Sequence, residues 1–153
     1  FSKSFSLYGE RVGALSVVCA DKDESTRLAS QLKRVIRTNY SSPPTHGSAI
    51  VAAILTTPAL RQQWEEELGQ MRNRIRSMRE QFVAKLAVHA PSHDFSFIAA
   101  QRGMFSYSGL TSAQVDRLRD EFGIYALATG RICVAALNNR NIDYVVDAVA
   151  KVI

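Results

Sequence analysis

The sequence has few of the cysteine and histidine residues that disulfide-rich domains and metalloproteins depend on. It contains only two cysteines, Cys19 and Cys133, which lie in apolar runs and lack the spacing of a redox or zinc motif. We therefore expect two free, buried thiols and no disulfide. The three histidines have no partners at metal-ligand spacing, so we expect no metal site.

Long runs of one kind are also missing. No apolar stretch reaches the roughly 18 residues that a membrane-spanning helix needs, and no signal peptide is visible, so we expect a cytoplasmic protein without a membrane contact. The formal net charge is +5, but no five or six basic residues follow one another. We interpret the arginines of MRNRIRSMRE (71–80) as a solvated helix face and expect no nucleic-acid partner. The alternative, a basic nucleic-acid-binding module, would bind oligonucleotides with a steep salt dependence.

Enough hydrophobic residues are present to build a core. They make up 46% of the 153 residues, and charged residues make up 22%, which is ordinary for one globular domain or parts of two. Residues 12–20 are apolar and β-rich, which predicts a strand buried in a sheet. A helical period predicts an amphipathic helix over 23–38. The consecutive prolines at 43–44 predict an extended connector, and Thr45 can then cap a second, apolar helix.

A long helix is predicted next. Thr57 followed by Pro58 is a strong start signal, and apolar residues then recur at steps of three or four as far as Leu86. The helix would cover residues 58–88, which is ~45 Å at about 1.5 Å per residue. Because few single domains are so wide, we expect this helix to link two domains, residues 1–70 and 71–153.

The pattern of strands and helices predicted after residue 91 is typical of an α+β domain. Two predicted strands, FSFIAA and GMFSYSGL, would form a hairpin across a turn at 101–103. Thr111 and Gln114 form a capping box that opens a helix, and this helix ends at Gly123. Two short strands within IYALATGRICVAAL and a closing helix over 141–153 complete the pattern.

The first residues carry the chemistry. FSKSFSLYGERVG (1–13) places Lys3 eight positions before Arg11. A lysine amine can form a Schiff base with an aldehyde cofactor, and an arginine guanidinium can hold that cofactor's phosphate through two hydrogen bonds. The small serines around the lysine leave room for a flat ring to approach the backbone. Two solvated surface charges are the alternative interpretation of this pair.

This string resembles the pyridoxal-phosphate attachment site of class I aminotransferases. Three further segments, RTNYSSPPTHG, GMFSYSGL and ATGRICVAAL, are similar to the aspartate and aromatic branch of that family, closest to the bacterial aromatic (tyrosine) aminotransferases. The resemblance implies an α/β fold, the C-terminal portion of a fold-type-I pyridoxal-phosphate-dependent transferase. Residues 1–70 would finish the large cofactor-binding domain, and residues 71–153 would form the small α+β domain. It also implies a homodimer whose active sites are shared across the interface.

The resemblance assigns roles to individual residues. Lys3 would form the Schiff base with pyridoxal phosphate and, once freed, would move the proton of the substrate Cα. Arg11 would bind the cofactor phosphate, and Tyr8 would lie beside the cofactor, with core packing as the alternative for Tyr8. Arg131 would clamp the substrate α-carboxylate, with a salt bridge inside the fold as its alternative. Arg37 would recognise the distal carboxylate of dicarboxylic substrates across the dimer interface.

Two more positions bear on the substrate. Phe105 would line the substrate pocket, with core packing as its alternative, and Ser42 would border the site. Aspartate-specific members commonly have asparagine where this chain has Ser4 and Ser42. The resemblance therefore implies transamination between aromatic or dicarboxylic amino acids and 2-oxo acids, with an aspartate-specific enzyme as the alternative. The family's partner of the pyridine nitrogen lies outside this chain, so we expect the chain alone to be catalytically incompetent. A truncated product that keeps only interaction surfaces is the remaining alternative.

Overall fold

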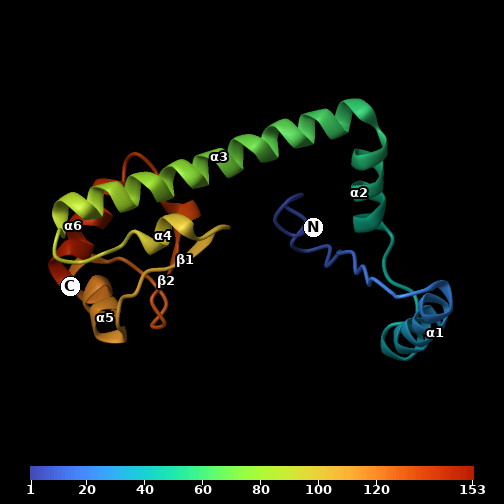
Figure 1. The fold of residues 1–153 in the computed structure, drawn as a ribbon. Helices are drawn as coiled ribbons and strands as arrows, with labels where there is room; N and C mark the ends of the chain where they lie inside the picture. Colours follow the sequence, from blue (N-terminus) through green and yellow to red (C-terminus); the bar gives the residue numbers. More distant parts are fainter. The chain divides into compact units, whose positions relative to one another are not determined.

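The structure, a computed structural model, describes all 153 residues and divides into two compact units, Phe1–Leu68 and Gly69–Ile153. One helix, α3, begins in the first unit and continues into the second (Figure 1). No helix of the chain combines the length and the apolar character that crossing a membrane requires. In chain order the elements are α1 (Lys22–Asn39), α2 (His46–Thr56), α3 (Pro58–His89), α4 (Phe97–Ala100), β1 (Phe105–Tyr107), α5 (Ser112–Phe122), β2 (Arg131–Cys133), the 3-10 turn η1 (Val134–Ala136) and α6 (Ile142–Val152).

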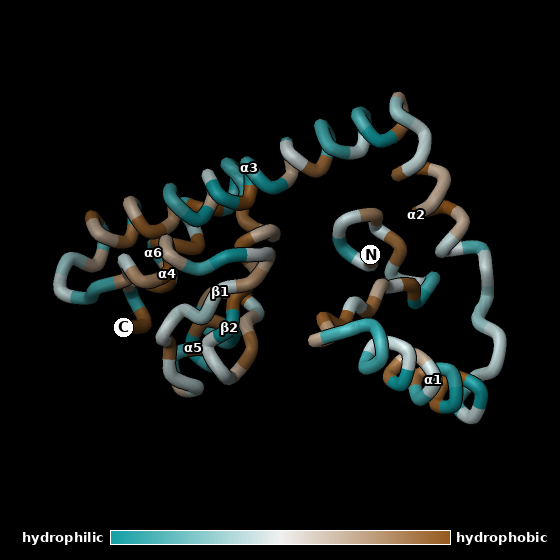
Figure 2. Tube along the Cα trace, turned by 45° about the vertical axis from the view of Figure 1, so that its right-hand side comes forward, coloured by the Kyte–Doolittle hydropathy of each residue, from teal (hydrophilic) through white to brown (hydrophobic).

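The helices of the first unit begin close to where the sequence predicts, although Thr45, which precedes α2, makes no side-chain capping hydrogen bond. Asp21 precedes α1, and its side chain accepts a hydrogen bond from the backbone N–H of Glu24 at 2.7 Å. The Glu24 carboxylate in turn accepts from the N–H of Ala20 at 2.6 Å, so one free donor of the first turn and one just before the helix are satisfied. Hydrophobic and hydrophilic residues alternate around α1 (Figure 2), and none of its residues is buried within the unit.

The strand predicted over residues 12–20 is wrong. This segment forms no regular element, and its apolar side chains are open to solvent, with Leu15 76% and Val18 98% exposed. A strand exists only when a neighbouring strand satisfies its backbone N–H and C=O groups. The first unit contains no other strand, so high β-propensity alone produces no strand at residues 12–20.

The long helix is confirmed within one residue of its predicted end. In the second unit α3 buries Met78, Phe82 and Leu86, which are spaced four residues apart and therefore lie on one face. They join one hydrophobic core with α4, α5 and α6, including Ile98, Leu118, Ile142, Val146 and Val149. Figure 1 shows the two strands and α6 lying along this C-terminal half of α3.

The predicted hairpin is also wrong. β1 pairs with β2, not with residues 95–100, and the register is antiparallel with Phe105 opposite Cys133 and Tyr107 opposite Arg131. Residues 97–100 form the short helix α4, because the Asp94 carboxylate accepts from the N–H of Ser96 at 2.8 Å and turns the chain there. Of the two strands predicted in 124–137, only β2 forms, and the 3-10 turn η1 follows it directly.

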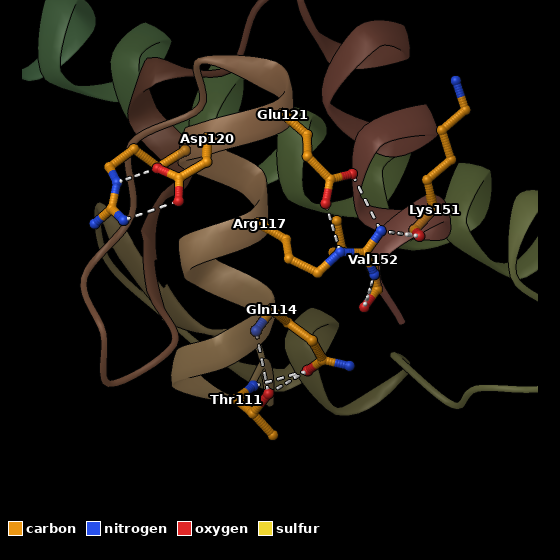
Figure 3. Close-up of polar contacts among 8 residues, drawn as sticks. Thr111, Gln114, Arg117, Asp120, Glu121, Lys151 and Val152 are labelled. Atoms are coloured by element: carbon orange, nitrogen blue, oxygen red, sulfur yellow. Dashed lines mark hydrogen bonds and ion pairs between the residues drawn. The ribbon is translucent and has the colours of Figure 1, made fainter.

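The capping box of α5 is confirmed. The Thr111 side chain accepts from the Gln114 N–H at 3.3 Å, and the Gln114 side chain accepts from the Thr111 N–H at 2.8 Å (Figure 3). The helix ends at Gly123 in the left-handed conformation, as predicted. Arg117 then joins α5 to the end of α6, because its guanidinium donates to the carbonyl oxygens of Lys151 and Val152 as well as to a carboxylate of its own helix.

The two cysteine thiols are free, as expected, but they are not buried. Cys133 is exposed and Cys19 is half-buried. The apolar residues around each cysteine in the sequence favour burial of its side chain. Cys133, however, lies on β2, where successive side chains point to opposite faces, and its face is the open one.

Candidate functional site

Lys3, Tyr8 and Arg11 come together in the first unit. The Lys3 Nζ lies 5.0 Å from the centroid of the Tyr8 ring, a cation–π arrangement. The Arg11 Nη1 donates to the backbone carbonyl oxygen of Tyr8 at 3.0 Å. The eight-residue spacing therefore brings both cations to one tyrosine. Tyr8 is 48% exposed, so the alternative of core packing does not describe it in this unit.

The loop that carries these residues is attached to the rest of the unit by its aromatic side chains. Phe5 stacks on Trp64 of α3 with ring centroids 4.7 Å apart, and the Trp64 Nε1 donates to the carbonyl oxygen of Ser4 at 2.6 Å. Ser6 and Arg11 both have left-handed backbones, with φ of 55° and 51°. Such a conformation costs a non-glycine residue roughly 1–2 kcal/mol, and tertiary contacts hold it.

The charges of this loop suit an anionic ligand. Neither Lys3 nor Arg11 forms an ion pair. The loop's carboxylate, on Glu10, instead pairs with the Nδ1 of His46 on α2 at 3.1 Å. A primary amine and a guanidinium without a carboxylate between them form a donor set that fits an aldehyde carrying a phosphate group.

Gly47 is a residue of this region that sequence reasoning missed. A Cβ at this buried position would lie 2.8 Å from the Cβ of Glu10 and 3.2 Å from a methyl of Val12, so only glycine lets the loop approach α2 this closely. A glycine in the first turn of a helix is the signal that could have revealed it, because glycine disfavours helix and is retained there for a packing reason.

Arg37 and the serines after α1 form a separate polar group. The Arg37 Nη1 donates to the Oγ of Ser41 at 3.3 Å, and Ser41 has a left-handed backbone with φ of 61°. Ser42 follows on the exposed turn. Arg37 forms no ion pair, and no hydrogen bond joins this group to the Lys3 loop.

In the second unit, Arg131 and Phe105 meet across the strand pair. The centre of the Arg131 guanidinium lies 4.9 Å from the centroid of the Phe105 ring. Tyr107 stands directly opposite Arg131 in the register, so two aromatic side chains share its face of the strands. These residues line an open cavity of about 310 Å³ together with Ser106 and Thr129. Arg131 forms no salt bridge within the fold, and Phe105 is 44% exposed, so neither alternative from the sequence describes this unit.

Gly130 places Arg131 at the start of β2. Its φ is 79°, and a Cβ there would lie 2.7 Å from the carbonyl oxygen of Leu110. The Gly130 carbonyl accepts from both the N–H and the Oγ of Ser108, at 2.9 Å and 2.7 Å. The turn before Arg131 is therefore held against the end of β1. Sequence reasoning identified Gly130-Arg131 but not Ser108, because this contact spans 22 residues.

Gln101 holds the other edge of β1. Its side-chain Nε2 donates to the carbonyl oxygen of Tyr107 at 2.9 Å, and its Oε1 accepts from the Tyr107 N–H at 2.7 Å. The amide thus replaces the strand that β1 lacks on this edge. No local pattern in the sequence marks Gln101 for this role.

Comparison with known proteins identifies the family to which the chain belongs. Residues 1–149 match the family described as aminotransferase class I and II, and the chain belongs to this family. The chain is 63% identical to an aspartate aminotransferase of Pseudomonas aeruginosa over 153 residues, which are all of this chain and 38% of that protein. It is 53% identical to an aromatic-amino-acid aminotransferase of Escherichia coli over 152 residues, 99% of this chain and 38% of that protein.

Solved structures agree with these sequence relatives. The aromatic-amino-acid aminotransferase of Burkholderia pseudomallei, solved covalently bound to pyridoxal phosphate, superposes with a TM-score of 0.92 at 70% identity and covers 99% of this chain and 38% of that one. The resemblance inferred from the sequence is thus confirmed, and so is the fold class, part of a fold-type-I transferase. The chain spans only about 38% of the length of these relatives.

Proposed function

We propose that these residues belong to a pyridoxal-phosphate-dependent aminotransferase that moves an amino group between aromatic or dicarboxylic amino acids and 2-oxo acids. The observation that carries the proposal is the arrangement of Lys3 and Arg11 around Tyr8, in a chain that matches the family over residues 1–149. The related Burkholderia enzyme, which holds pyridoxal phosphate covalently, supports the cofactor.

Lys3 would hold the cofactor and handle the proton. When bound, pyridoxal phosphate supplies an electron sink that makes the substrate Cα proton removable. The Lys3 amine is the nucleophile of the loop, and it would hold the cofactor at its aldehyde carbon. When free, the Lys3 amine would act as the general base that accepts the proton from the substrate Cα. Tyr8, whose ring the Lys3 Nζ faces, would keep the amine directed toward the cofactor.

Arg11 would bind the cofactor phosphate. One of its guanidinium nitrogens donates to the carbonyl oxygen of Tyr8, and this contact fixes the orientation of the planar group. The remaining N–H groups are free to donate to phosphate oxygens in the two-bond geometry that arginine favours. Because Glu10 pairs with His46, its carboxylate does not compete for this guanidinium.

The substrate roles follow the same logic. Arg131 would bind the α-carboxylate, since its guanidinium is held by the Phe105 ring and has no carboxylate partner in its unit. Phe105 would contact the substrate side chain. Arg37 and Ser42 would recognise a distal carboxylate from the neighbouring subunit of a homodimer. The relatives include both aspartate and aromatic-amino-acid aminotransferases, which supports the broader substrate range over an aspartate-specific enzyme.

The wider context is part of the same proposal. The first unit would be the end of the large cofactor-binding domain and the second the small domain. The enzyme would work as a homodimer in the cytoplasm. This chain on its own would be catalytically incompetent, because it spans about 38% of the related enzymes.

The test is to reduce the protein with borohydride in the presence of pyridoxal phosphate and to map the adduct by peptide mass spectrometry. We expect one equivalent of label on Lys3 in the complete enzyme, and loss of transamination in Lys3→Ala. Lys33→Ala, which removes an exposed lysine of α1, is the matched control and should leave both unchanged. Labelling scattered over several lysines, or transamination that survives in Lys3→Ala, would contradict the proposal.

A further inference from the structure

A buried arginine of α3 contacts the strand that carries Phe105. Arg79 is only 4% exposed and has no carboxylate partner. Its Nε donates to the Oγ of Ser106 at 3.3 Å, and its Nη2 donates to the carbonyl oxygen of Gly103. Burial, with a smaller contribution from the nearby Arg102, lowers the pKa of Arg79 below its ordinary value. A cation is costly to bury against neutral acceptors alone, so the two hydrogen bonds are what offsets part of the cost of burying Arg79 here.

The two contacts of Arg79 hold β1 from its buried face. Ser106 is the middle residue of β1 and is 2% exposed, while Phe105 and Tyr107 on either side of it point to the open face. Gly103, with a φ of 87°, lies in the turn that leads into the strand. Arg79 therefore holds both the entry and the centre of β1, and the side chains on the opposite face follow the position of that backbone.

We propose that Arg79 is a positioning residue for the substrate site around Arg131, a role that rests on the function proposed above. By holding Ser106 and Gly103, it keeps β1 where the Phe105 ring covers the Arg131 guanidinium. Arg79 itself does not reach the open face. Its effect on the substrate passes through the Phe105 ring, which limits the orientations of the Arg131 guanidinium before a carboxylate binds.

The consequence is a change in affinity and not in the chemical step. Without Arg79, β1 can shift and the guanidinium loses its contact with the ring, so each carboxylate must then order Arg131 as it binds. Such a loss weakens ground state and transition state alike, which raises KM and leaves kcat unchanged. A cation–π contact at an exposed site corresponds to about a fivefold rise in KM, or ~1 kcal/mol at 298 K.

The test compares Arg79→Met with Arg76→Met in the complete enzyme. Arg76 lies on the same helix but is exposed and pairs only with Glu80, so it is the matched control. We expect Arg79→Met to raise KM for amino acids about fivefold with kcat within about twofold, and Arg76→Met to change neither. Arg79→Lys should recover part of the affinity because an ammonium can still donate to one of the two acceptors.

Two further measurements keep the proposal open to refutation if Arg79→Met folds poorly. Ser106→Ala removes one acceptor without changing the helix, and it should raise KM in the same direction. The double variant Arg79→Met/Phe105→Ala should have the KM of Phe105→Ala alone, because both substitutions remove the same contact, that of the Phe105 ring with the Arg131 guanidinium. A KM that is unchanged in Arg79→Met, or effects that simply add, would overturn the positioning role.

A spectroscopic measurement separates this role from the proposed function. At 4.9 Å the Phe105 ring should shift the resonances of the Arg131 guanidinium protons, and we expect this ring-current shift to disappear in Arg79→Met but not in Arg76→Met. If the wild-type enzyme does not transaminate, the proposed function fails. The ring-current shift still tests whether Arg79 keeps the Phe105 ring over the Arg131 guanidinium. If the shift persists in Arg79→Met, the positioning role fails whatever the activity.

Discussion

Replacing Gly130 by alanine should lower the free energy of unfolding of the second unit for two reasons, backbone strain and a steric clash of the new methyl group. The left-handed φ of 79° costs an alanine roughly 1–2 kcal/mol. The new methyl would also lie 2.7 Å from the carbonyl oxygen of Leu110, a backbone atom that no rotamer change can move away. Overpacking of this kind costs about 1–3 kcal/mol. Subtracting the ~0.4–1 kcal/mol that alanine gains by restricting the unfolded chain leaves a loss of about 1–4.6 kcal/mol, with a centre of ~3 kcal/mol.

Gly103→Ala is the matched control for this prediction. Gly103 also has a left-handed φ, 87°, but no atom lies within 4 Å of the added methyl. Gly103→Ala should lower the free energy of unfolding by about 0–1.6 kcal/mol, because only the backbone strain opposes the gain in the unfolded state. Urea denaturation followed by far-ultraviolet circular dichroism measures both free energies of unfolding by linear extrapolation. If the two substitutions cost the same, the close approach of Gly130 to Leu110 does not hold the site, and the reasoning fails.

Two smaller predictions concern polar contacts of the second unit. Thr111→Ala removes the side-chain acceptor of the α5 capping box and should lower the free energy of unfolding by about 1 kcal/mol, measured by the same denaturation experiment. The hydrogen bond from the Ser96 N–H lowers the pKa of Asp94 below its ordinary value of 3.8. This bond therefore contributes stability above that pH, and the contribution disappears as the pH falls through the lower folded-state pKa. Asp94→Asn keeps an acceptor oxygen but does not titrate, so we expect the variant to be slightly less stable than the wild type at pH 7 and to lose less stability in acid.

Each of these has an internal comparison. Ser112→Ala, one position after the cap, removes a hydroxyl that makes no hydrogen bond and should not destabilise α5. An equal loss in Ser112→Ala and Thr111→Ala would show that the capping box contributes nothing. For Asp94, a difference in stability between the variant and the wild type that stays constant from pH 7 to below pH 3.8 would show that the contact with Ser96 makes no pH-dependent contribution.

The helices were predictable because their signals are local. Thr57-Pro58 marks the start of α3 and Gly123 marks the end of α5, since each signal acts on hydrogen bonds within one turn. That Lys3 and Arg11 lie near each other was equally predictable, because a loop of eight residues is short enough to bring both side chains into contact with Tyr8. The role proposed for each residue still depends on the family resemblance, because the same two cations could also have been solvated.

The strands were not predictable in the same way. Residues 95–100 and 12–20 have the composition of strands, yet the first contains a short helix and the second forms no element. A strand is stabilised by its partner, and the partner of β1 begins 26 positions later at Arg131. No window of the sequence contains both partners, so composition alone suggested a hairpin with the nearer apolar run.

By itself the sequence determined the long helices, the capping box of α5, the family, and the side chains available for cofactor and substrate. Only the tertiary structure decided which groups hold those side chains in place. Gly47 lets the Lys3 loop approach α2 closely, and Gly130 lets the turn before Arg131 approach Leu110. Arg79 donates a hydrogen bond to the buried face of β1. The reason is physical: a cap or a helix period is satisfied within a few neighbouring residues. A close approach or a buried hydrogen bond, in contrast, exists only after distant segments of the chain have packed together.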